Sequence, residues 1–392
     1  MIAAEYARLY RDNLMDSVIP FWLKHSGDRE YGGYFTCLDT SGNVYDTDKF
    51  LWLQCRQIWC FSMLYNRVEA NREWLDFAIQ GAEFVLRHGR DAEGNWYFSL
   101  DRRGRPLVQP YNIFSDCFAT MALGQLYIAT GEERYADVAR KTFYTILRRA
   151  NDPKGSWSKQ YPGTRPLKGF SLPMILCNLV IEIESLLPEE VLKTTIDNGI
   201  DTVMGQFYRP ELGLIVEHIL PDGSLSDSFE GRLVNPGHGI EAMWFIMDLA
   251  VRQNKPELIR QAVEITLSTL EVAWDKKFGG VCYFLDRKGY PPQQLEWDQK
   301  LWWVHIESLV SLAKGYQHTG DPRCWEWFEK LHAYTWDHFV DEKNGEWFGY
   351  LNRQGEVLLP LKGGKWKGCF HVPRGLFQVW QTMRSISERS KQ

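Results

Sequence analysis

The chain has 392 residues, a formal net charge of −5 and a pI of about 6.0, with no cluster of basic residues. This balance excludes nucleic acids and acidic membrane surfaces as expected partners. No apolar run reaches 18 residues and the N-terminus lacks a signal-like pattern, so the sequence predicts a soluble cytoplasmic protein. No linker rich in proline and serine divides the chain, so we expect one catalytic domain over residues 1–392.

Apolar residues recur at helical spacing in twelve segments. The first is expected at residues 2–24 and the last at residues 372–388, and these two make one pair. Five further pairs are predicted between them, at residues 46–66 and 70–89, 110–130 and 133–149, 168–186 and 188–207, 236–254 and 256–274, and 296–318 and 322–340.

A short glycine–aromatic pattern separates the helix pairs and returns about every 60 residues, which indicates an array of one repeated unit. Alternating residues followed by an Asp–Gly turn predict a short β-hairpin in each unit. The sequence therefore predicts an all-α fold, an (α/α)6 barrel with hairpins at one end; an open superhelix is the alternative. A pocket is expected among the hairpins and the helix starts that follow them. The repeats begin at Gly33, Gly94, Gly155, Gly213, Gly280 and Gly345.

One predicted helix start contains a histidine. Asn235 is a good N-cap and Pro236 suits the first helical position, which places His238 in the first turn with Glu241 on the same face. A helix N-terminus disfavours a charged imidazole, so His238 is expected to stay neutral, as a general base must. A capping histidine in the hairpin layer is the alternative.

A second helix start carries another histidine and an arginine. Pro373 predicts that a helix begins there, so His371 lies just before it and Arg374 lies in its first turn. A cation at this end opposes the helix dipole, which points to an anionic ligand. An arginine paired with a nearby carboxylate is the alternative.

Polar residues also interrupt two apolar helices. Trp302 and His305 share one face of a helix, and Glu307 lies beside them, as expected for an inner helix that faces a polar cavity. A histidine and a glutamate that satisfy each other in the core are the alternative. In another helix Arg56 follows an apolar stretch, and a buried arginine is rarely without a partner, so it either pairs structurally or lines the pocket.

Taken together, four motifs resemble the N-acylglucosamine 2-epimerase family over nearly the whole chain and in the same order. The family has the (α/α)6 barrel fold, also contains cellobiose 2-epimerases and aldose–ketose isomerases, and has mammalian members that bind renin. The motifs are Trp-Leu-Gln-x-Arg-Gln at 52–57, Glu-Gly-Arg-Leu-Val-Asn-Pro-Gly-His at 230–238 with Glu241, Trp-Trp-Val-His-Ile-Glu at 302–307, and Gly-Cys-Phe-His-Val-Pro-Arg at 368–374.

The resemblance implies that N-acetylglucosamine and N-acetylmannosamine, two amino sugars that differ at C2, are interconverted. It implies His238 and His371 as the two acid/bases and Arg56 as the group that stabilises charge on O1. No redox cofactor or metal is needed for such a reaction. The residues expected to bind or orient the sugar are Glu241, Trp302, His305, Glu307, Trp366 and Arg374.

Members of this family are often homodimers and are often stimulated by ATP without consuming it. The sequence has no phosphate-binding GxxxxGK[ST] motif, and the effector candidates Lys154, Lys159 and Arg165 lie in a basic, glycine-containing loop. A solvated loop without a ligand is the alternative.

Two other classes of function compete with a sugar epimerase. A glycoside hydrolase on the same barrel needs two carboxylates at the scissile bond, and Glu241 and Glu307 are available for that role. A non-catalytic binding protein is the second. Neither requires His238, His371 and Arg56 together.

Overall fold

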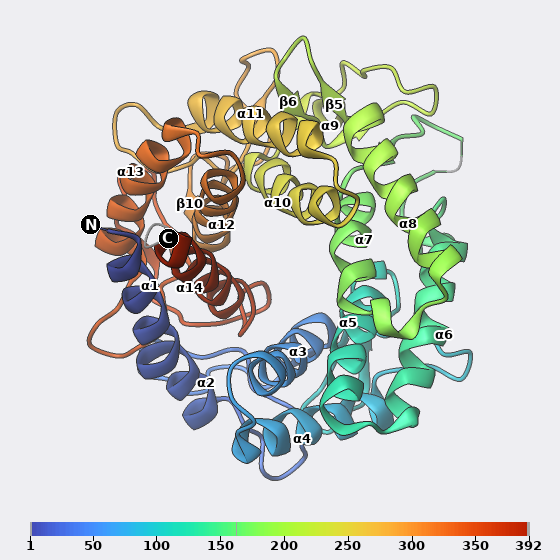
Figure 1. Ribbon diagram of the computed structural model, residues 1–392. Helices are drawn as coiled ribbons and strands as arrows, with labels where there is room; N and C mark the ends of the chain where they lie inside the picture. Colours follow the sequence, from blue (N-terminus) through green and yellow to red (C-terminus); the bar gives the residue numbers. More distant parts are fainter. Residues whose placement is uncertain (1, 162, 390–392) are drawn as a thin grey trace.

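The computed structural model describes residues 2–161 and 163–389, and within them thirteen main helices form two concentric rings, with α1 and α2 together filling one outer position (Figure 1). This confirms the predicted fold class. The inner ring contains α3 (Leu51–Arg67), α5 (Ile113–Thr130), α7 (Ser171–Glu182), α10 (Pro236–Arg252), α12 (Trp302–Thr319) and α14 (His371–Arg389). The outer ring contains α1 (Ala3–Asp12) with α2 (Ile19–His25), α4 (Arg72–His88), α6 (Glu133–Arg149), α8 (Glu189–Thr202), α11 (Pro256–Ala273) and α13 (Pro322–Phe339).

The first outer helix differs from the prediction of one continuous helix. A π-helical stretch, Asn13–Val18, separates α1 from α2. An additional short helix, α9 (Phe229–Arg232), precedes α10. Asn235 caps α10 by accepting a hydrogen bond from the backbone N–H of His238, at 3.2 Å, so this predicted helix start is confirmed.

The ring closes between the last and the first inner helix. Phe370, directly before α14, packs edge-on against Trp59 of α3 with ring centroids 5.1 Å apart. The sulfur of Cys369 lies 3.7 Å from that of Cys60, also in α3. The first and last described helices, α1 and α14, pack against each other (Figure 1). These contacts rule out the open superhelix.

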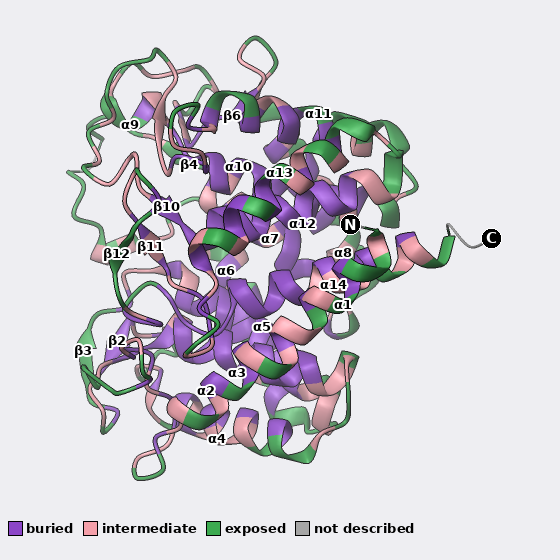
Figure 2. Ribbon diagram, turned by 90° about the vertical axis from the view of Figure 1, so that its left-hand side faces the viewer, coloured by how far each residue is buried: buried purple, intermediate pink, exposed green. Residues whose placement is uncertain are grey.

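The short strands gather at one end of the barrel, on the left in Figure 2. Among the described residues, three of the strand pairs lie within one repeat and the other four join neighbouring repeats, which the sequence pattern did not predict; single bridges close further local hairpins. All pairs are antiparallel. The local pairs are β2 (Ser99–Leu100) with β3 (Pro106–Val108), β5 (Tyr208–Arg209) with β6 (Leu214–Ile215), and β11 (Tyr350–Leu351) with β12 (Val357–Leu359). The others are β1 (Lys49–Phe50) with β2, β4 (Lys168–Gly169) with β7 (His218–Ile219), β8 (Leu233–Val234) with β9 (Leu285–Asp286), and β10 (Lys300–Leu301) with β11.

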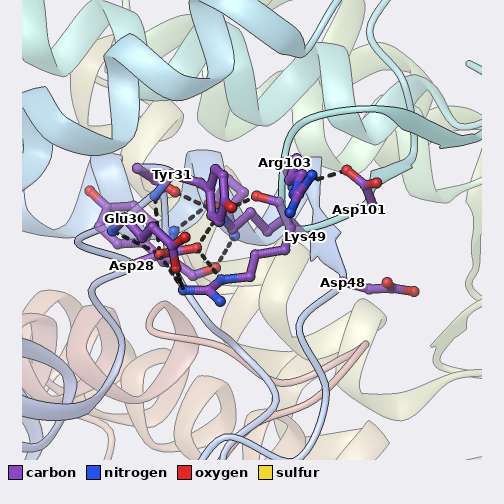
Figure 3. Close-up of polar contacts among 12 residues, drawn as sticks. Asp28, Glu30, Tyr31, Asp48, Lys49, Asp101 and Arg103 are labelled. Atoms are coloured by element: carbon purple, nitrogen blue, oxygen red, sulfur yellow. Dashed lines mark hydrogen bonds and ion pairs between the residues drawn. The ribbon is translucent and has the colours of Figure 1, made fainter.

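Buried lysines tie the loops at this end together. Lys49, directly before α3, donates to Asp28 at 2.9 Å and to the backbone carbonyls of Gly32 at 2.6 Å and Arg102 at 2.9 Å, so its ammonium group has three acceptors (Figure 3). Asp28 also orders its own turn by accepting backbone N–H groups. The same buried lysine–aspartate pair recurs at Lys300 with Asp275 and at Lys362 with Asp341.

All eight cysteines are buried and unpaired, as the sequence predicted for core thiols. None of the helices in the described part of the chain combines the length and apolarity that crossing a membrane requires.

We expect Lys49→Met to lower the free energy of unfolding by about 3 kcal/mol. Removing one partner of a buried ion pair costs about 3–5 kcal/mol, and the lower end applies because Arg102 still pairs with Asp28. Denaturant unfolding measures the change, with Lys24→Met at an exposed position as the control. A loss no larger than that of the control would contradict this role.

Candidate active site

The starts of three inner helices bring two histidines and a tryptophan together. His238 lies in the first turn of α10, Trp303 in the first turn of α12, and His371 is the first residue of α14. The Trp303 ring centroid lies 5.3 Å from that of His238 and 5.7 Å from that of His371. Residues 133 positions apart in the chain therefore share one site, because every inner helix starts at the same end of the barrel.

His238 is held by a glutamate that the sequence prediction did not include. Its Nδ1 lies 3.1 and 3.2 Å from the two carboxylate oxygens of Glu217, so Nδ1 carries the hydrogen and Nε2 is left for chemistry. Burial by itself lowers the pKa of His238, but the charge and hydrogen bond of Glu217 outweigh burial and raise it above the ordinary 6.5. This raised pKa is opposite in direction to the effect of a helix N-terminus, on which the expectation of a neutral His238 rested.

His371 is held in the same way but has the opposite electrostatic environment. Its Nδ1 lies 2.7 Å from Glu307, which again leaves Nε2 free of a protein partner. Burial, then the positive charge of Arg56, lowers the pKa of His371 well below its ordinary value. Arg374 donates to the same oxygen of Glu307, at 2.6 Å, so the charge of this carboxylate is already compensated. His371 is therefore neutral at pH 7.

Arg374 bridges two buried carboxylates. Its guanidinium donates to both Glu241 and Glu307, and all three side chains are buried. The anions that the sequence led us to expect beside Arg374 are thus side chains of the protein. Glu241, Glu307 and His371 also form the one group among the described residues with spacing suited to a metal ion, but Arg374 already supplies a cation to both carboxylates.

Arg56 lies in an aromatic cage. The centre of its guanidinium is 4.4 Å from the ring centroid of Trp52, 4.0 Å from Phe118 and 4.6 Å from Phe370. Burial, followed by the like charge of Arg374, lowers the pKa of Arg56 to about 9, so it stays cationic at neutral pH. Its Nε has no hydrogen-bond partner in the structure.

Four buried N–H donors around this cluster lack an acceptor, and they belong to Arg56, Arg374, Trp52 and Trp302. The Trp302 ring centroid lies 6.5 Å from that of His371. Trp366 is half exposed and packs edge-on against Trp52 at 5.6 Å. Buried donors without acceptors are costly, so this arrangement suits a ligand rich in oxygen acceptors.

His305 does not face the cluster, which corrects its assignment as a sugar-binding residue. Its Nδ1 donates to the backbone carbonyl of Leu301 at 2.7 Å, and its Nε2 accepts from the backbone N–H of Val281 at 3.1 Å. The side chain is fully buried, and burial lowers its pKa to about 3. Both ring nitrogens are used by the backbone, so His305 joins a hairpin to the start of α12. The core pairing with Glu307 is absent, and neither ring nitrogen of His305 is left to bind a ligand.

The effector candidates lie outside this cluster of side chains. Lys154, Lys159 and Arg165 are exposed on the segment between α6 and β4. Arg165 lies 3.7 Å from Glu230. Pro162, within the same segment, is outside the described residues.

A signal for Glu217 exists in the repeat. Five hairpins can be aligned by two reference residues. The first pairs with the end of the preceding helix, as Ile215 does, and the second begins the turn, as Leu220 does; Glu217 lies two positions after the first and three before the second. Among these positions only Glu217 is charged, and the others are Thr36, Phe98, Tyr283 and Gly349. A departure from the repeat at a single copy marks a residue kept for something other than packing.

A closed double ring of six helix pairs places this chain in the class of (α/α)6 barrel proteins. Two histidines, each held by a glutamate, lie at the hairpin end of this barrel. The N-acylglucosamine 2-epimerase (GlcNAc 2-epimerase) family model matches residues 33–372. The chain belongs to this family, as its motifs indicated.

Curated relatives and solved structures agree with this membership. The N-acylglucosamine 2-epimerase of Mus musculus is 39% identical, with 96% of this chain and 91% of the relative covered. That of Homo sapiens is 38% identical, covering 96% and 90%. A cellobiose 2-epimerase from Bacillus thermoamylovorans superimposes with a TM-score of 0.84 at 21% identity, covering 96% and 99% of the two chains. A D-mannose isomerase superimposes with a TM-score of 0.81 at 18% identity, covering 96% of this chain and 98% of that chain. These two solved structures show that the fold is shared.

We expect His305→Ala to destabilise the protein by at least about 2 kcal/mol, because two buried backbone groups lose their partners. The KM for sugar of the folded variant is expected to stay within twofold of the wild type. Thermal unfolding and steady-state kinetics measure the two effects. A stable variant with a greatly increased KM would restore His305 as a sugar-binding residue.

Proposed function

We propose that this protein is an isomerase that interconverts N-acetylglucosamine and N-acetylmannosamine. The observation that carries the proposal is the pair of histidines, each with Nδ1 held by a glutamate and Nε2 free, that both contact Trp303. The curated relatives at 38–39% identity carry the name of this activity. The cellobiose 2-epimerases among the curated relatives are only 23–24% identical, which favours the amino sugar.

The chemistry requires an acid/base on each face of C2. The sugar ring opens, and the C1 aldehyde acidifies the proton on C2. One histidine removes this proton, and the C–H electron pair moves into an enolate with negative charge on O1. The other histidine delivers a proton to C2 from the opposite face, which inverts the centre. No electrons leave the sugar, so the reaction needs no redox cofactor.

Arg56 fits the stabilisation of the enolate. Its guanidinium is cationic, buried and close enough to His371 to influence its pKa. An interaction with developing charge in a site that excludes water is worth far more than in solution. The N-acetyl group at C2 prevents the formation of a simple ketose, so the substrate directs the chemistry to epimerisation.

The other residues of the cluster act on the histidines. Glu307 and Arg374 hold the ring of His371, and Glu241 shares Arg374 with Glu307. Trp302 and Trp366 offer an indole N–H and an exposed ring face to a sugar. A homodimer and activation by ATP stay predictions from the family, and a cytoplasmic location and an effector site at Lys154, Lys159 and Arg165 stay predictions from the sequence.

We expect His238→Ala and His371→Ala each to lose at least about 10²-fold in epimerisation while remaining folded, the lower end of what a positioned acid/base contributes. Incubation in D2O, followed by proton NMR from each sugar, separates their roles. The variant that lacks only the reprotonating histidine is expected to exchange the C2 proton without inversion, and the roles swap with the other sugar. Near-normal epimerisation in both variants would remove the histidines from the mechanism.

Arg56→Lys keeps the charge but loses the planar guanidinium that stacks among three aromatic rings. We expect kcat to fall by roughly tenfold or more, the lower end for a lost oxyanion contact, with little change in melting temperature. Initial rates and thermal unfolding test this. A fully active variant, or one that only unfolds, would contradict the oxyanion role.

A further inference from the structure

Glu217 is fixed by the backbone on both sides. Its N–H donates to the carbonyl of Leu233 at 3.4 Å, and its carbonyl accepts from the N–H of Phe170 at 2.9 Å. The next two residues, His218 and Ile219, form β7 and pair with β4. The backbone that carries the carboxylate of Glu217 is therefore held in place, and the side chain is buried.

The position occupied by Glu217 faces the site in other repeats as well. The equivalent Tyr283 packs edge-on against Trp303 at 6.0 Å, and the equivalent Phe98 lies 6.4 Å from Trp366. A buried carboxylate at such a position is costly without a partner, and His238 is that partner. In the other repeats an uncharged side chain fills this position, so packing of the hairpin does not require the charge of Glu217.

The charged groups around the two histidines differ in sign. His238 faces Glu217 from the β6–β7 segment, Glu241 from its own helix and Arg56 from α3. Near His371, Arg56 of α3, Arg374 of its own helix and His238 of α10 oppose a positive charge, and Glu241 of α10 favours it. The carboxylate of Glu307, from α12, is shared with Arg374, whereas that of Glu217 has His238 as its partner.

We propose that Glu217 is the positioning residue that makes His238 the proton donor of the resting enzyme, so that His371 starts the reaction as the base. This inference rests on the proposed epimerisation. From one epimer, the C2–H bond breaks and the proton moves to Nε2 of His371. The proton on Nε2 of His238 then moves to C2 on the other face. Proton exchange with solvent returns both histidines to their starting states.

Histidine NMR tests the electrostatic part without any sugar. With 15N-labelled histidine, the pKa of His238 is expected to fall by about one unit or more in Glu217→Gln, the size of shift that loss of a nearby opposite charge produces. The Nδ1–H tautomer is expected to remain, because the glutamine oxygen still accepts. Glu211→Gln, an exposed glutamate of the same repeat, is the matched control and should leave this pKa unchanged. An unchanged pKa in Glu217→Gln would overturn the inference.

The kinetic test is the ratio of C2 exchange to inversion in D2O, at a pH above the pKa of His238. A variant changes steady-state kcat/KM by the same factor in both directions, because the equilibrium constant between the two sugars is fixed. The ratio of exchange to inversion is not bound in this way, so it can differ between the two sugars. In Glu217→Gln we expect it to rise by at least about threefold from the epimer that His371 deprotonates, since fewer molecules hold a proton on His238. From the other epimer His238 carries the proton it has just removed, so the ratio should stay within twofold.

Equal changes from both sugars, or no change from either, would overturn the role of Glu217. Glu217→Asp retains the charge and serves as the second variant, and its His238 pKa should lie above that of Glu217→Gln. It also keeps the test open if Glu217→Gln does not fold. A wild-type protein that neither exchanges nor inverts either sugar would instead refute the proposed function, while the NMR result would still stand.

Discussion

Three inner helices meet through a single buried cation. Arg374 of α14 donates to Glu241 of α10 and to Glu307 of α12, and Glu307 also holds His371. Removing one partner from such a group leaves an uncompensated charge in the core, which is among the largest penalties a fold can incur. The orientation of His371 therefore depends on the packing of the helices themselves, and a small shift of α10 or α12 would move its ring.

The two histidines have the same geometry and opposite chemistry. Each places Nδ1 against a carboxylate, yet Glu307 is neutralised by Arg374 and Glu217 is not. Because the charge of Glu307 is already paired with Arg374, it does little to stabilise a positive charge on His371, whereas Glu217 stabilises one on His238. The pKa values of His371 and His238 therefore move in opposite directions. A reaction that removes a proton from one face and adds one to the other needs this inequality, because one acid and one base must be present together.

The barrel repeats its structure and varies its chemistry. Buried lysine–aspartate pairs at Lys49, Lys300 and Lys362 fix three of the loops in the same way, so the hairpin end is a rigid platform. On that platform the residues proposed to carry function are ones that break the repeat. Glu217 replaces an uncharged residue at its repeat position, and Arg56 interrupts an apolar inner helix. The cellobiose 2-epimerase and the D-mannose isomerase share the fold at 21% and 18% identity.

The sequence by itself determined the helix pairs and the helix start at Asn235, because periodicity and capping act within a few residues. It placed the start of α14 at Pro373, two residues after its observed start at His371, and it left closure of the barrel open, because closure depends on contacts between the first and last inner helices. It also singled out His238, His371 and Arg56, since polar residues at helix starts or inside apolar helices conflict with local rules. Only the tertiary structure decided which contacts these residues make. The strands pair between neighbouring repeats, His305 is used up by two backbone groups, and Glu217 reaches His238 from another segment. These outcomes depend on distances between segments far apart in the chain, and local pattern contains no information on such distances.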